Sequence, residues 1–210
     1  MKKVFASFVL TMMLATVAAA APNPTEQLQA GVGKILSLLN DKSLDPDVRN
    51  SEIEEIVRDH FDFDVMAQWI LGIHWRKASP QERERFINLF TDLLEANYKG
   101  RIGEYAEQYD DERIDYVGER IIEDRALIDT FVVTKNKKIP ISYKMILQGD
   151  EWKIYDVVIE EVSLVRNFRN TYDEIVRKEG LSGLFARMEQ KITDLRSGKI
   201  PPAEANGGAQ

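Results

Sequence analysis

The first half of the chain carries apolar residues at the spacing of amphipathic helices. Apolar positions that recur every three or four residues predict helices over residues 26–40, 45–62, 64–75 and 78–106. The third of these segments is apolar nearly all round, which is typical of a buried helix. The fourth has the clearest start, with Ser79 as N-cap, Pro80 at the first helical position and Glu82 closing a capping box.

Beyond Asp111 the pattern changes to short runs rich in β-branched and aromatic residues. Four such runs predict strands over residues 113–122, 126–135, 139–148 and 151–160. Gly149-Asp150 separates the last two runs and is a two-residue hairpin signal, which makes these strands antiparallel neighbours. The fourth run is apolar on both sides, which indicates cover on both faces, or cover plus a cavity.

Helical spacing returns after the strands. In VSLVRNFRNTYDEIV (residues 162–176), an apolar stripe follows Ser163, which we expect to be the N-cap. A further apolar helical pattern begins after Gly180. Helices, then an antiparallel meander, then helices together predict an α+β fold.

The two ends of the chain have compositions that fall outside a folded domain. Residues 1–20 combine Lys2 and Lys3, an apolar run and small residues, which is the pattern of a cleavable signal peptide. Residues 199–210 are polar and contain Pro and Gly, which predicts a disordered tail. We therefore expect one domain over residues 21–198, exported most simply to the periplasm.

Charge and cysteine content narrow the possible partners. The chain has 28 Lys+Arg against 35 Asp+Glu, a formal net charge of −7. Such an acidic protein has no electrostatic reason to bind nucleic acid, so we expect none as a partner. There is no cysteine, and hence no disulfide.

Residues that carry chemistry are few, and no catalytic motif is present. His60 and His74, the two histidines, lie fourteen positions apart and do not form a zinc pattern without cysteines, so we expect no metal and no cofactor. No nucleophile elbow or Gly-rich fingerprint occurs. Asp129 and Asp156 are the strand residues that an enzyme would use as acid or base, and neither has an evident partner in the sequence. We expect that the protein is not an enzyme.

Large apolar residues are abundant on the predicted sheet and on the helices that follow or precede it. They include Phe86, Phe90, Tyr98, Phe131, Tyr143, Met145, Trp152, Tyr155, Phe168, Tyr172 and Phe185. A filled core and the wall of a ligand cavity both explain such a set. Periodicity alone leaves the two open.

Two long stretches, residues 71–102 and 140–188, together with the signal sequence resemble a known family. The landmarks are LG-x-x-W-R from Leu71, S-P-x-E-R-x-R-F from Ser79, W-K-Φ-Y-D from Trp152 (Φ is apolar), V-S-L-Φ-x-N-Φ-R from Val162 and G-L-x-G-L from Gly180. In this order they resemble the periplasmic phospholipid carriers of the Mla lipid-asymmetry pathway, also called the toluene-tolerance auxiliary family. One departure is Glu161, where many members have Gly before Val-Ser.

The resemblance implies a fold and a function. The fold is a four-stranded, curved antiparallel sheet of the nuclear-transport-factor-like kind, with N-terminal and C-terminal helices enclosing a lipid cavity. The function is that of a monomeric carrier that holds phospholipid by its acyl tails. It would shuttle lipid between an outer-membrane lipoprotein–porin complex and an inner-membrane ABC transporter complex with a lipid-shuttle ring.

On this basis we predict lipid-binding and docking residues. The tails are expected to contact apolar and aromatic side chains of sheet and helices, namely Met66, Ile70, Phe90, Tyr98, Phe131, Val133, Tyr143, Met145, Tyr155, Val157, Val165, Phe168 and Tyr172. Arg166 and Arg169 are candidates for contact with the head group or with an acidic partner. Two other classes stay open: a small-pocket enzyme on a cone-shaped sheet, and a periplasmic interaction or chaperone module.

Overall fold

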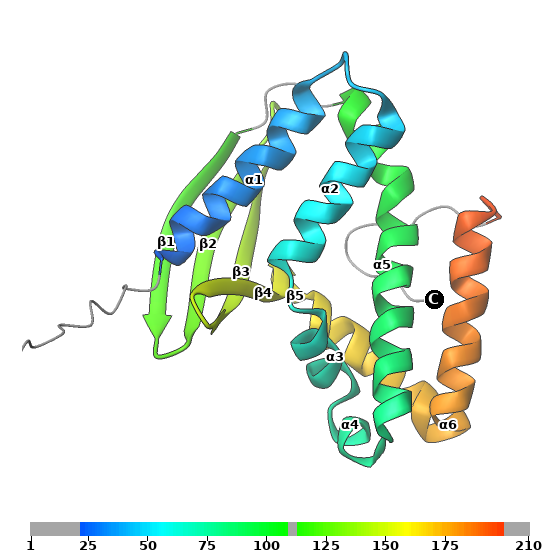
Figure 1. Cartoon of the computed structure of the whole chain (residues 1–210). Helices are drawn as coiled ribbons and strands as arrows, with labels where there is room; N and C mark the ends of the chain where they lie inside the picture. Colours follow the sequence, from blue (N-terminus) through cyan, green and yellow to red (C-terminus); the bar gives the residue numbers. More distant parts are fainter. Residues whose placement is uncertain (1–21, 109–112, 200–210) are drawn as a thin grey trace, which may run out of the picture.

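The protein has an α+β fold in which helices flank a curved antiparallel sheet (Figure 1). The computed structural model describes residues 22–108 and 113–199, so the expected signal peptide and, apart from Lys199, the expected tail lie outside the described residues. The elements are α1 (Pro24–Asn40), α2 (Pro46–His60), α3 (Phe63–Leu71), α4 (Ile73–Lys77), α5 (Pro80–Gln108), β1 (Arg113–Ile122), β2 (Arg125–Val133), β3 (Lys138–Gln148), β4 (Glu151–Ile159), β5 (Val162–Ser163) and α6 (Leu164–Arg196). The predicted fold class is confirmed.

Side-chain caps fix where several helices begin. The predicted capping box is present at α5, where the Glu82 N–H donates to Ser79 Oγ over 3.2 Å and the Ser79 N–H donates to Glu82 Oε2 over 2.8 Å. Ser163 caps α6 as predicted, since its Oγ accepts from the Arg166 N–H at 3.0 Å. Asp62 caps α3 in the same way.

The third predicted helix is two helices in the structure. We expected one helix over residues 64–75, but α3 ends at Leu71 and α4 begins at Ile73. Gly72 between them has φ +53° and ψ −113°, a conformation that L side chains rarely adopt. The Arg169 guanidinium packs against Gly72 so closely that a Cβ there would lie 3.0 Å from Nη2. The break therefore lies where Arg169 of α6 packs against the α3–α4 link.

The sheet is a meander with strand order β1-β2-β3-β4-β5, all neighbours being antiparallel. The expected Gly149-Asp150 hairpin joins β3 and β4, with Gln148 paired to Glu151. We expected four strands and the structure has five, because Val162–Ser163 turns back and pairs with Ile159 and Val158. In Figure 1, α1 lies in front of the sheet and α2 lies between the sheet and α5. Gly180 interrupts α6 with a non-helical backbone, and the second part of α6, after Gly180, runs side by side with α5.

A bulge in β4 changes which of its residues face the helices. Ile154 pairs with Met145, whereas Val157 pairs with Tyr143 two positions along β3, so the register shifts by one residue around Tyr155. The simple alternation that the sequence suggests for this strand is therefore wrong. Ile154 and Val157 lie on the same face, although they are three residues apart.

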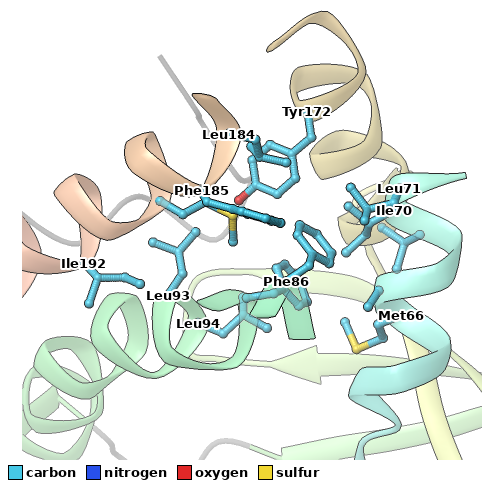
Figure 2. Packing of buried hydrophobic residues seen from close by; sticks show 14 of the residues in the cluster. Met66, Ile70, Leu71, Phe86, Leu93, Leu94, Tyr172, Leu184, Phe185 and Ile192 are labelled. Atoms are coloured by element: carbon cyan, nitrogen blue, oxygen red, sulfur yellow. The ribbon is translucent and has the colours of Figure 1, made fainter. Parts of the chain in front are cut away.

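The buried residues form two clusters. One joins α1 to the sheet through Leu28, Ala126, Ile128, Met145, Trp152 and Ile154. The other joins α3, α5 and both parts of α6, and Figure 2 shows Phe86, Tyr172 and Phe185 meeting near its centre. The Phe86 and Tyr172 rings meet edge to face with centroids 6.0 Å apart. Phe61, between α2 and α3, packs against both clusters.

Asp156 connects the sheet to the start of α6. Its carboxylate accepts from Lys144 Nζ at 2.8 Å, from Ser163 Oγ at 2.7 Å and from the Val165 N–H at 3.1 Å. Asp156 is only 3% exposed, and a buried carboxylate is tolerated only with partners of this kind. The three donors come from β3, β5 and α6, so this one side chain holds three elements together.

Replacing Asp156 by Ala is expected to lower the free energy of unfolding by about 2–4 kcal/mol, because Lys144 and the first turn of α6 lose their buried acceptor. Urea denaturation measures this. Glu189→Ala is the control, since Glu189 forms an exposed ion pair with Arg85 and its removal should change stability by less than about 1 kcal/mol. Equal effects of the two substitutions would contradict the connecting role of Asp156.

The turn between β4 and β5 is strained. Glu160 and Glu161 form it and have φ values of +47° and +70°, so two consecutive L side chains adopt the left-handed conformation of a type I′ turn. The family departure at Glu161 therefore lies at a position where Gly would be relaxed.

Glu161→Gly is expected to raise the free energy of unfolding by about 1 kcal/mol, because it removes one of these left-handed side chains. Glu161→Gln removes the charge and keeps the Cβ, so it should leave stability nearly unchanged. Thermal or urea unfolding compares the two. A gain in the Gln variant as large as in the Gly variant would attribute the effect to charge and not to the backbone.

Candidate functional site

An apolar cavity lies between the two buried clusters, bounded by α2, α5, β4, β5 and the start of α6. Its volume is about 210 Å³. A cavity that holds a single water needs only about 10–15 Å³, so this cavity is far larger than a packing defect. The described lining residues are Ile53, Glu54, Val57, Arg58, Phe61, Phe63, Leu94, Glu95, Tyr98, Val157, Ile159, Val162, Leu164 and Asn167.

Local periodicity explains how each element contributes to this wall. On α2, Ile53 and Val57 are four residues apart, and on α5 Leu94 and Tyr98 have the same spacing, so each pair lies on one helical face. On β4, the bulge places Val157 on the same face as Ile154, and Val157 lines the cavity there.

The link between α2 and α3 is held beside the edge of β4. Phe61 forms a parallel bridge with Ile154, and the Asp62 N–H donates to the Ile154 carbonyl at 2.8 Å. The Asp62 carboxylate caps α3 through the Val65 N–H and accepts from the Gln148 side chain. These bonds place the rings of Phe61 and Phe63, whose centroids are 6.1 Å apart, in the cavity wall.

Polar side chains interrupt the wall where α2 faces α5. Arg58 of α2 forms an ion pair with Glu95 of α5, and Glu54 lies one turn before Arg58. Burial raises the pKa of the Glu95 carboxyl; Arg58 opposes this shift, while the negative charges of Glu54 and Asp92 add to it. We call Glu54, Arg58 and Glu95 the polar corner of the cavity.

Comparison with known proteins shows the family to which this chain belongs. The sequence profile of the family described as MlaC protein matches residues 29–190. The chain belongs to the MlaC family. The resemblance seen in the sequence motifs is thereby confirmed.

Two relatives of this MlaC-family chain have informative descriptions. It is 26% identical, over 89% of its length and 91% of the relative's, to the "Intermembrane phospholipid transport system binding protein MlaC" of Haemophilus influenzae. Its fold matches a phospholipid-binding protein from Ralstonia solanacearum, solved in complex with a phospholipid, with a TM-score of 0.72 at 20% identity. That match covers 83% of this chain and 99% of the other.

Two of the residues predicted to contact lipid, Tyr98 and Val157, line the cavity. The others do not appear among its described lining residues. Six belong to the helical cluster or pack directly on it: Met66, Ile70, Phe90, Val165, Phe168 and Tyr172. Core packing accounts for their apolar character, since Phe90 for example lies edge to face on Phe168 with centroids 5.1 Å apart.

The remaining predicted residues lie on the sheet, away from the cavity wall. Met145 and Tyr143 belong to the cluster under α1. Tyr155, at the bulge, stacks on Trp69 with centroids 6.2 Å apart. Phe131 and Val133 alternate with buried Thr130 and so lie on the opposite face, where Lys138 Nζ is 4.2 Å from the Phe131 ring centroid. A bulge and the choice of covered face cannot be deduced from apolar periodicity, so the sequence could not separate these residues from those of the cavity wall. Their contact with lipid stays a prediction.

Neither predicted arginine lines the cavity. The Arg169 guanidinium packs on Gly72 at the α3–α4 break, and Arg166 is exposed on the first turn of α6. Their docking role stays a prediction. The cation that does line the cavity, Arg58, was not predicted, because in the sequence it is one of several charged residues along α2 and nothing distinguishes it from a solvated side chain.

The residues considered for catalysis have structural partners outside the cavity wall. Asp129 accepts from Ser142 Oγ at 2.5 Å, and Asp156 is the connection to α6 described above. His74 Nε2 lies 2.8 Å from Asp173 Oδ1, joining α4 to α6, and His60 Nδ1 lies 2.8 Å from the Ile56 carbonyl. Within residues 22–108 and 113–199, no group of three or more His, Asp or Glu could hold a metal ion.

Over the part of the chain that the structure describes, no helix has both the length and the apolar character needed to cross a membrane.

Tyr143 should make stability depend on alkaline pH. Burial, and to a lesser extent Tyr116, raise the pKa of Tyr143 to about 12. Because the folded state holds this proton more tightly than an unfolded chain with a Tyr pKa of about 10, the stabilisation is complete below pH 10 and is lost as the pH rises toward 12. Between pH 10 and 12 the free energy of unfolding should therefore fall more steeply in the wild type than in Tyr143→Phe, by up to about 1.4 kcal/mol per pH unit. Urea denaturation at several pH values checks this, and parallel pH profiles of the two proteins would contradict it.

Proposed function

We propose that this MlaC-family protein is a phospholipid carrier that holds acyl tails in the cavity between α2, α5 and β4. The observation that carries the proposal is the apolar and aromatic lining of a cavity inside a fold shared with a protein solved in complex with a phospholipid. The name of the Haemophilus influenzae relative, a binding protein of an intermembrane phospholipid transport system, supports the same function.

The energetics of lipid transport require such a wall. A diacyl phospholipid has about 30 methylenes, each stabilised by about 0.8 kcal/mol on leaving water, so about 24 kcal/mol must be matched before the lipid leaves a bilayer. Polar groups contribute nothing to that sum, whereas Ile53, Val57, Phe61, Phe63 and Val157 offer a dry surface. The cavity thus suits tails in preference to a small polar substrate, which favours a carrier over the enzyme alternative.

We also propose the cellular setting. The signal-like residues 1–20 would direct the protein to the periplasm. There it would shuttle lipid between an outer-membrane lipoprotein–porin complex and an inner-membrane ABC transporter complex with a lipid-shuttle ring. The competing function is that of a chaperone or interaction module. Such a module would bind no lipid in the cavity.

Native mass spectrometry of the freshly purified protein tests the carrier function. We expect bound phospholipid on the wild type and its loss in Val57→Trp, because the indole would fill the cavity at α2. Val117→Trp is the matched control, since the same change is made at a side chain that is 55% exposed on β1. Lipid should remain bound to that variant.

Two results would overturn the proposal. One is a wild-type protein that carries no phospholipid and takes none up from vesicles. The other is a folded Val57→Trp variant that retains as much lipid as Val117→Trp.

A further inference from the structure

The polar corner of the cavity is unusual because it places one cation inside an otherwise apolar wall. Arg58 is the sole cationic side chain among the described lining residues, and Glu54 and Glu95 are its neighbours there. The Arg58 side chain is 55% exposed although it lines the cavity, so it lies where the cavity meets solvent. A ligand with apolar tails inside would place its polar end at this position.

The chemistry of Arg58 selects an anionic oxygen cluster. A guanidinium presents a planar fork of N–H donors that matches a phosphate or carboxylate with two parallel hydrogen bonds. In the described structure Glu95 Oε1 pairs with Nη2 of this guanidinium. Because Arg58 reaches α5 from α2 across the cavity edge, a phosphate entering there would meet the guanidinium directly.

Glu95 is a partner that can be displaced. It is partly buried, and the charges of Glu54 and Asp92 oppose its own negative charge. Burial raises the pKa of Glu95 even with Arg58 beside it, so the ion pair offsets only part of the cost of placing this carboxylate here. Arg196, the other cation near this group, is 3.6 Å from Asp92 and is not among the cavity-lining residues.

We propose that Arg58 binds the phosphate of the lipid head group by exchanging its ion pair with Glu95 for one with the cargo. This inference rests on the proposed carrier function and adds a preference for phosphate-bearing lipids over neutral lipids with the same tails. Glu95 thereby acts as an internal competitor that holds the guanidinium in place while the cavity is empty.

The test compares two lipids with identical acyl chains, one with a phosphate-bearing head group and one without. Delipidated protein is incubated with neutral carrier vesicles that contain equal amounts of phosphatidylglycerol and diacylglycerol with identical acyl chains, and the bound lipids are extracted and quantified by mass spectrometry. The wild type should take up phosphatidylglycerol in about tenfold excess, which is the scale of a charge-assisted hydrogen-bond pair.

Two variants distinguish phosphate binding from a merely structural ion pair. Arg58→Gln should bring the ratio close to one, whereas Glu95→Gln, which frees the guanidinium, should raise the ratio above that of the wild type. If the ion pair were merely structural, the ratio of bound phosphatidylglycerol to diacylglycerol would change in the same direction in both variants. Arg187→Gln is the control, because Arg187 is an exposed arginine paired with Glu179 on α6 and should leave the ratio unchanged.

Titration of inorganic phosphate into the delipidated protein separates a head-group site from a site for free phosphate. If the protein prefers phosphatidylglycerol but does not bind free phosphate, the head-group assignment is supported. If it binds free phosphate through Arg58 but shows no lipid preference, the assignment is overturned. Equal uptake of both lipids by the wild type, or parallel changes in the two variants, would also reject the inference while leaving the carrier function intact. Uptake of neither lipid would reject the carrier function itself.

Discussion

One buried carboxylate, Asp156, joins the two halves of this fold. Its oxygens accept from β3, β5 and the first turn of α6, and none of these donors could be buried alone without a large cost in free energy. The start of α6 is consequently held against β4. Leu164 and Asn167, which flank Val165 on α6, form part of the cavity wall. The rest of α6 packs on α5 and completes the helical core.

The cavity exists because the sheet and the helices have separate cores. The apolar face of β4 begins under α1, with Trp152 and Ile154 fully buried, and the bulge at Tyr155 keeps Val157 and Ile159 on that face. There the face meets α2 and α5 instead of α1, and these helices leave space that side chains do not fill. The same residue types thus make a close-packed core at one end of the strand and an open wall at the other.

Charge has a local role in a protein whose formal net charge is −7. The net negative charge of the protein repels an anionic lipid, so any recognition of a phosphate depends on a particular cation. Arg58 has that position at the cavity edge, where it is paired with Glu95. The wall of this MlaC-family protein is thus largely apolar, with Arg58 as the one cation among its described lining residues.

Local signals in the sequence determined most of the elements. Apolar periodicity predicted the helices and the four long strands, Ser79-Pro80 and Ser163 predicted helix starts, and Gly149-Asp150 predicted the hairpin, because capping and turn formation depend on residues within a few positions of one another. The ordered motifs from Leu71 to Leu184 also determined the family. Of the thirteen side chains predicted to contact lipid, however, the cavity wall includes Tyr98 and Val157.

The tertiary structure decided which apolar side chains are core and which are wall. Phe90 and Tyr98 belong to one helix and look alike in sequence, yet Phe90 is enclosed by α3, α5 and α6 while Tyr98 faces the cavity. The β4 bulge, the break at Gly72 and the meeting of Arg58 with Glu95 likewise depend on contacts between residues distant along the chain. Apolar periodicity records only that a side chain avoids water. Whether it does so against protein atoms or against a cavity is set by how the elements pack.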